Sequence, residues 1–155
     1  AFLAIPDARL TGYKQTLLDH GIPFDERLVL TPDSANILTG AYTATEKILT
    51  LQPRPTAIFA ANDESAVSAI AALKDHGVKV PEEMAIVSID NIDIAAMTRP
   101  GLTTVDVPKK QMAAYALQTL LMHERVKGQR SPSIVLPTEL VIRESCGAKL
   151  RRSSK

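Results

Sequence analysis

The sequence predicts a three-layer α/β/α sandwich with a mainly parallel sheet. Helical patterns alternate along the chain with short apolar runs, which is typical of βα units whose sheet is covered on both faces. The runs at residues 56–61 and 84–89 have the composition of buried strands. A chain of 155 residues that is 45% hydrophobic is long enough for one domain with an aliphatic core.

The first half of the chain contains three predicted helices separated by strands. The first helix is expected to begin after Asp7 as N-cap and to end at His20-Gly21, followed by a short strand at 27–30. The second is expected to start near Asp33 or Ser34 and to end before Pro53. Its predicted inward stripe is Ile37, Ala41, Ala44 and Ile48, and the third helix, after Asn62-Asp63, turns Ala66, Val67, Ile70 and Leu73 inward.

The second half contains the longest predicted helix, from Pro108 to about Lys127-Gly128. This helix has an uninterrupted apolar face that needs a partner, formed by Met112, Ala113, Ala116, Leu117, Leu120 and Leu121. Residues 133–136 and 139–142 are expected to form two strand segments around Pro137. The tripeptide Asp-His-Gly occurs at 19–21 and 75–77, and in both places we interpret it as a helix stop rather than a catalytic motif.

Charge and composition exclude several classes of protein. Eighteen basic and 17 acidic residues give a net charge of +1, so the body of the chain lacks the basic footprint of a nucleic-acid-binding surface. The single cysteine, Cys146, has no metal-ligand spacing around it. No apolar run approaches the roughly 18 residues of a membrane span. The start at Ala1 resembles no signal peptide, and we expect an upstream segment to be missing.

Polar residues follow two of the predicted buried strands. Asn62-Asp63 comes after one strand and Asp90-Asn91 after another. Ligands of open parallel sheets bind beyond the carboxyl ends of the strands, where such side chains can bridge the hydroxyl groups of a polyol or sugar. Asn and Asp are also strong helix N-cap residues, so the pattern alone leaves both a binding role and a capping role open.

Enzyme signatures are absent from the sequence. There is no glycine-rich phosphate loop, no nucleophile elbow and no paired Cys or His set, so we expect no catalytic residues, no metal site and no cofactor. An acid–base pair formed by Asp63 and Glu64, or by Asp90 and Asp93, is the alternative interpretation of these carboxylates. Carboxylates at helix starts are common for capping reasons, which favours the non-catalytic interpretation.

Several segments, in this order and spacing, resemble regulators of the LacI/GalR (lactose and galactose repressor) family. They are Ala57–Asp63, Leu73–Gly77 with Val80–Glu83, the strand into Asp90-Asn91, Arg99–Val105 and Leu136–Ser145. The resemblance covers about residues 9–147. It implies a type I periplasmic-binding-protein-like sensor of two similar subdomains with a small effector between them.

The resemblance also implies how this chain is organised. Residues 1–147 would be a partial effector-binding (sensor) domain, mostly its C-terminal subdomain. Residues 102–128 would cross to an otherwise missing N-terminal subdomain, which would supply the partner for the apolar helix face. Residues 148–155 would be a basic polar tail, and the DNA-binding helix-turn-helix would not be part of this chain.

Three residues are carried over from the family as effector contacts. Arg9 begins Arg9-Leu10-Thr11-Gly12-Tyr13, which matches the family pattern Arg-x-x-Gly-aromatic, and Asn62 and Asp90 match the polar residues after the two strands. The chain departs from the family at Ser88-Ile89, where many members have Gly and an aromatic residue, and at Ala35, where many have an aromatic residue.

The resemblance implies a cytoplasmic homodimer that does not bind membranes. Its partners would be a small-molecule effector (a sugar, sugar phosphate or nucleoside) and operator DNA, the latter only through the absent N-terminal domain. A periplasmic sugar-binding protein of a transporter shares the predicted fold and is the first alternative, and an enzyme on a doubly wound sheet is the second.

Overall fold

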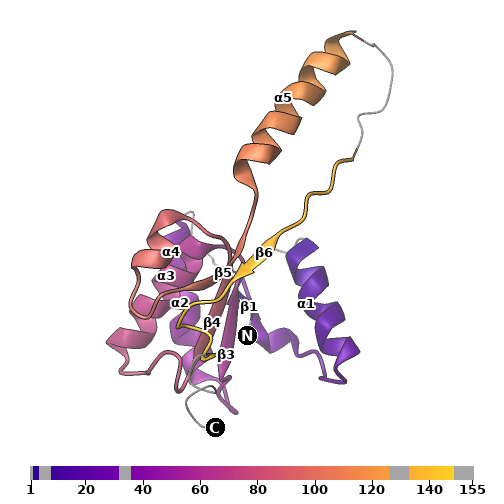
Figure 1. Cartoon of the computed structure of the whole chain (residues 1–155). Coiled ribbons are helices and arrows are strands. Elements are labelled where there is room, and N and C mark those ends of the chain that lie inside the picture. Colours follow the sequence, from indigo (N-terminus) through magenta and orange to yellow (C-terminus); the bar gives the residue numbers. More distant parts are fainter. Residues whose placement is uncertain (1, 4–7, 32–35, 126–132, 149–155) are drawn as a thin grey trace.

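The computed structural model describes residues 2–3, 8–31, 36–125 and 133–148 (Figure 1). Within these residues the sheet has six strands in the order β2-β1-β3-β4-β5-β6. All neighbouring pairs are parallel except β5 and β6, which are antiparallel. The predicted, mainly parallel sheet is confirmed. The strands are β1 (Phe2–Leu3), β2 (Val29–Leu30), β3 (Ala57–Ala60), β4 (Ala85–Asp90), β5 (Thr103–Asp106) and β6 (Glu139–Val141).

Helices cover both faces of this sheet, as expected for three layers. Figure 1 shows α1 on one side of the strands and α2, α3 and α4 on the other. The prediction of an α/β/α sandwich is therefore confirmed. The helices are α1 (Ala8–Asp19), α2 (Ile37–Thr50), α3 (Asp63–Asp75), α4 (Asp93–Met97) and α5 (Lys109–Arg125), with a 3-10 turn η1 (Glu26–Leu28) before β2.

The main core lies between the sheet and the layer formed by α2 and α3. Ile48, Leu73, Met84 and Ile86 are completely buried there. Alanines at four core positions of the two helices allow the helix backbones to approach closely, so that short side chains fill the space between them. This packing holds β3 and β4 in place, and the candidate site lies at the ends of these two strands.

Both Asp-His-Gly tripeptides end a helix, as the sequence predicts. Nδ1 of His20 lies 2.9 Å from the carbonyl oxygen of Thr16, and Nδ1 of His76 lies 2.9 Å from that of Ala72. Gly21 and Gly77 follow with φ of 66° and 69°, a left-handed conformation that glycine adopts without steric cost. The histidines therefore satisfy helix carbonyls, and the structural interpretation is confirmed.

Three predictions at the ends of elements are wrong. Residues 26–28 form the turn η1, so only Val29 and Leu30 of the expected strand are extended, because the Asp25 side chain caps this turn. The second helix begins at Ile37, since the Asn36 side chain accepts the backbone N–H groups of Leu38 and Thr39; Asp33 and Ser34 lie outside the described residues. Ile37 itself is 42% exposed rather than part of the inward stripe.

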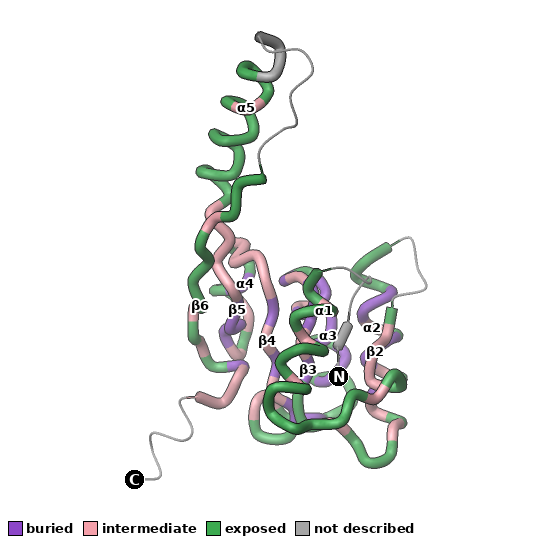
Figure 2. The backbone as a smooth tube through the Cα atoms, turned by 90° about the vertical axis from the view of Figure 1, so that its right-hand side faces the viewer, coloured by how far each residue is buried: buried purple, intermediate pink, exposed green. Residues whose placement is uncertain are grey.

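Helix α5 and the segment before β6 extend together away from the sheet (Figure 1). Residues 133–136 are not a strand, because no described strand lies beside them, and they run instead along α5. The apolar face of α5 is exposed, with Leu117 at 59% and Leu120 at 66%, and Figure 2 shows this helix almost entirely green.

The predicted end of the helix at 127–128 lies outside the described residues, as does the tail from 149 onward. No described helix has the length and apolar composition needed to cross a membrane.

Candidate functional site

The three residues selected from the sequence follow three neighbouring parallel strands. Arg9 lies in the first turn of α1, Asn62 follows β3, and Asp90 is the last residue of β4. Because β1, β3 and β4 are adjacent in the sheet, the three positions come to the same carboxyl edge. Arg9 is exposed, whereas Asn62 and Asp90 are half-buried, so this edge is open to a small molecule.

Asp90 is held in an unusual backbone conformation at this edge. Its φ is 121° and that of Asn91 is 51°, both in the region that favours glycine. Burial, and then the neighbouring carboxylate of Asp63, raise the pKa of Asp90 above its ordinary value. Arg9, Lys109 and the backbone N–H of Asp63 oppose this rise. The pKa of Asp90 is thus influenced by two cations and one buried carboxylate.

Asp63 is completely buried and joins β4, β5 and the start of α4. Its Oδ1 accepts the hydroxyl groups of Ser88 (2.5 Å) and Thr104 (2.6 Å), and its Oδ2 accepts the backbone N–H of Ile92 (2.8 Å). With both oxygens occupied inside the protein, this carboxylate has a structural role. This arrangement favours the non-catalytic interpretation of Asp63 over an acid–base pair with Glu64.

Asn62 combines the two roles that the sequence left open. Its Oδ1 accepts the backbone N–H of Ser65 at 2.9 Å and caps α3. The capping role is confirmed. Its Nδ2 donates to no described residue, so the amide group of this half-buried side chain retains a donor for a ligand.

Asn91 and three residues that the sequence analysis did not select, Asp106, Lys109 and Arg143, surround the end of β4. Asn91 donates from Nδ2 to Asp106 (2.9 Å) and accepts from Arg143 Nη2 at Oδ1 (2.8 Å). Lys109 donates to the carbonyl oxygen of Asp90 (2.5 Å) and lies 3.7 Å from the Asp106 carboxylate. The signal for Lys109 was present in the sequence: two lysines follow Pro108 at a helix start, where acidic residues are preferred.

This arrangement can bind a polyhydroxylated ligand. A carboxylate accepts hydrogen bonds from hydroxyl groups, while the Arg9 guanidinium and the Asn62 amide donate to hydroxyl or phosphate oxygens. Among the described residues, no group of three or more His, Cys, Asp or Glu side chains could hold a metal ion. The chemistry offered by this edge is recognition by hydrogen bonds.

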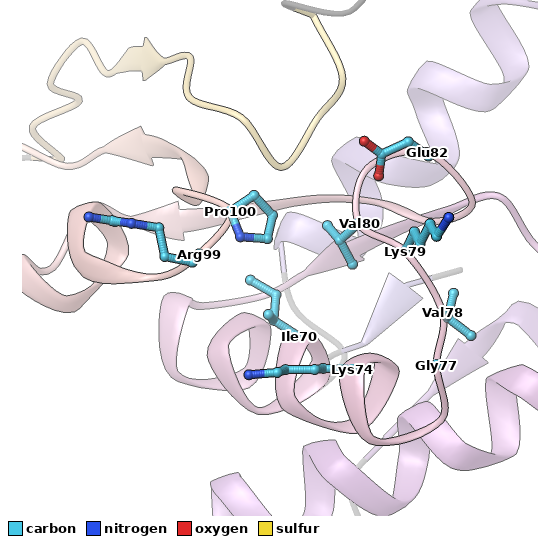
Figure 3. A pocket seen from close by; sticks show the side chains of 9 residues that line it. All are labelled: Ile70, Lys74, Gly77, Val78, Lys79, Val80, Glu82, Arg99 and Pro100. Carbon is cyan, nitrogen blue, oxygen red and sulfur yellow. The ribbon is translucent and has the colours of Figure 1, made fainter.

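A separate hollow of about 390 Å³ lies at the opposite end of the sheet (Figure 3). Ile70 of α3 and Pro100 face each other across it, and the side chains of Lys74 and Arg99 extend from its rim. The loops that form it precede β4 and β5, so it lies at the amino ends of these strands. Ligands of parallel sheets bind at carboxyl ends, so this hollow is a weaker candidate than the edge near Asp90.

Residues 2–146 match the family described as periplasmic binding protein-like domain. The chain belongs to this family. Within the family it is similar to the HTH-type transcriptional regulator DegA of Bacillus subtilis (strain 168), with 39% identity over 137 residues. That match covers 88% of this chain but 40% of DegA, so the chain spans about two fifths of the length of this relative.

Solved structures of this family agree with the sequence comparison. The complex of the transcriptional regulator CelR with cellobiose is 32% identical with a TM-score of 0.82, covering 94% of this chain and 46% of that one. A LacI family regulator from Enterococcus faecium with bound ribose is 27% identical with a TM-score of 0.78, covering 93% and 55%. The resemblance to effector-binding domains of LacI/GalR regulators is therefore confirmed.

Proposed function

We propose that this chain is the ligand-sensing part of a DNA-binding transcription regulator, and that it binds a sugar or sugar derivative through Arg9, Asn62 and Asp90. The single observation that carries the proposal is the meeting of these three positions at the carboxyl edge of β1, β3 and β4. Two structural relatives contain sugars, cellobiose and ribose, which supports this class of effector. Relatives named as transcription regulators favour this function over transport or catalysis.

In the proposed mechanism, the effector stabilises one arrangement of two subdomains and thereby changes the affinity for operator DNA. Only a difference in effector affinity between the two arrangements can shift their equilibrium. Residues 102–128 would cross from this subdomain to the other, and the exposed apolar face of α5 supports this, since a face of this size needs a partner. The regulator would operate in the cytoplasm, with DNA contacts made by residues outside this chain.

A ligand screen on the full-length protein tests the effector site. Thermal unfolding is measured with cellobiose, ribose, glucose 6-phosphate, gluconate and adenosine, because a compound at about 100 times its Kd adds roughly 2.7 kcal/mol of stability. We expect at least one compound to raise the melting temperature, and Asp90→Asn to abolish the shift. Asp93→Asn is the matched control, since Asp93 is exposed in α4 three residues away. A shift that survives in Asp90→Asn would refute the site.

The homodimer is part of the same proposal. Two apolar residues of α4, Ile94 and Met97, are exposed (45% and 73%) and offer a surface to a second copy. Sedimentation of the full-length protein at micromolar concentration should give a dimer that Met97→Lys weakens. Leu18→Lys is the control, because Leu18 is 71% exposed on α1, across the sheet from α4 (Figure 1). A native protein that sediments as a monomer would contradict the dimer.

A further inference from the structure

The turn at Asp90-Asn91 is held from both chain segments that lead to and from α5. Asn91 binds Asp106, the last residue of β5, and it also binds Arg143, which lies just beyond β6. Arg143 is fixed in turn by donating from Nη1 to the carbonyl oxygen of Leu102 at 2.6 Å. We call Asn91, Asp106, Lys109 and Arg143 the hinge clasp, because they join the end of β4 to both connections.

Within the hinge clasp, Lys109 alone donates to backbone oxygens of the turn itself. Its ammonium donates to the carbonyl oxygens of Asp90 (2.5 Å) and Asn91 (3.5 Å), and to that of Val107 (3.3 Å) in its own segment. Two consecutive non-glycine residues with positive φ persist only where their surroundings determine the conformation. Two of the three carbonyl oxygens that Lys109 binds belong to these two residues.

The position of Lys109 is unfavourable for the helix that it begins. A cation in the first turn opposes the helix dipole, and α5 has no acidic residue there. Helix stability therefore does not account for Lys109. Residues that break a local rule are expected where another interaction compensates, and the contact with the Asp90 carbonyl oxygen is such an interaction.

We propose that Lys109 is a positioning residue: it holds the Asp90-Asn91 turn in its observed conformation and makes the geometry of that turn depend on the position of α5. This inference rests on the proposed function, in which the Asp90 carboxylate contacts the effector. Because Lys109 belongs to α5, any movement of α5 relative to β4 changes the contacts of the Asp90 carbonyl group. Effector affinity then differs between arrangements of α5, which coupling to DNA binding requires.

Amide hydrogen exchange in the full-length protein without ligand tests the proposal. The reporters are the backbone N–H groups of Asn91 and Ile92, which donate to Thr104 Oγ1 and Asp63 Oδ2. Lys109→Met removes a charged donor whose shortest hydrogen bond is to the Asp90 carbonyl oxygen, and this loss should accelerate their exchange roughly ten-fold. Lys109→Arg keeps a cationic donor and should restore exchange to within about two-fold of the native rate.

Lys110→Met is the matched control, because Lys110 is an exposed neighbouring lysine for which the described part of the chain supplies no hydrogen bond or ion pair. Exchange in α2 and α3 should stay at the native rate in all variants, which separates a local effect from general destabilisation. Native exchange at the turn in Lys109→Met, or equal acceleration in Lys110→Met, would overturn the proposal. The measurement needs no effector, so a failed ligand screen would refute the proposed function without affecting this result.

Discussion

The buried carboxylate of Asp63 offers the sharpest test of how the site is supported. It accepts three hydrogen bonds, from Ser88, Thr104 and Ile92. A hydrogen bond to a charged group contributes about 1.5–3 kcal/mol to the free energy of unfolding, whereas one between neutral groups contributes about 0.5–1.5 kcal/mol. Asparagine can accept from Ile92 and donate to the two hydroxyl oxygens, so Asp63→Asn should lower the free energy of unfolding by about 2 kcal/mol. Part of the difference is offset because a buried neutral amide costs less than a buried charge.

Alanine at position 63 removes the acceptors altogether. The backbone N–H of Ile92 and the two buried hydroxyl groups then lose their partner, at about 1–3 kcal/mol each, so we expect Asp63→Ala to cost about 5 kcal/mol. Domain stabilities are about 5–15 kcal/mol, so this variant should be barely folded or unfolded.

Equilibrium unfolding in urea, monitored by circular dichroism, measures these free energies. Glu64→Gln is the matched control, since Glu64 is the exposed next residue and should change stability by less than about 0.5 kcal/mol. The reasoning is refuted if Asp63→Ala loses no more stability than Glu64→Gln. It is also refuted if Asp63→Asn is more stable than the native protein, because the carboxylate would then be a net cost to the fold.

Further predictions concern the site and the core. The raised pKa of Asp90 means that the charged form of this side chain is less favourable in the folded state than in the unfolded state. Asp90→Asn should therefore raise the melting temperature at pH 7, by an amount that shrinks as the pH falls towards the ordinary pKa of 3.8. An equal rise at pH 7 and near pH 3.8 would contradict this prediction. Asn62→Asp keeps the oxygen that caps α3, so the free energy of unfolding in urea should change by less than about 0.5 kcal/mol. The same variant loses the Nδ2 donor, so the rise in melting temperature with ligand should be lost. An unchanged rise would show that Nδ2 does not contact the ligand. Leu73→Ala should cost about 2–5 kcal/mol because Leu73 is completely buried, whereas Leu120→Ala, at 66% exposure, should cost far less in this chain measured alone. Gly77→Ala should cost about 1–2 kcal/mol, since φ is 69° there, and a neutral result would mean that the turn relaxes.

The layer architecture and the edge that carries the site could be predicted from local patterns. Apolar runs that are buried strands, such as residues 57–60, and helices that end at Gly21 and Gly77 depend on short stretches of chain, where periodicity and backbone freedom act over a few residues. The placement of Asn62 and Asp90 at one edge follows from parallel strand order alone. Element boundaries were less predictable: Asn36 caps α2, but Asp, Ser and Asn are all favoured N-cap residues, so local sequence does not decide among neighbouring candidates.

The sequence by itself determined the fold class, the family and the positions of the polar residues after β3 and β4. Only the tertiary structure decided what those residues contact. It assigned Asp63 to a buried network with Ser88 and Thr104, and it brought Lys109 to the carbonyl oxygen of Asp90, 19 positions away in sequence. The physical reason is that periodicity and capping are local properties of the chain, whereas hydrogen-bond partners and pKa shifts depend on side chains that only the sheet brings together.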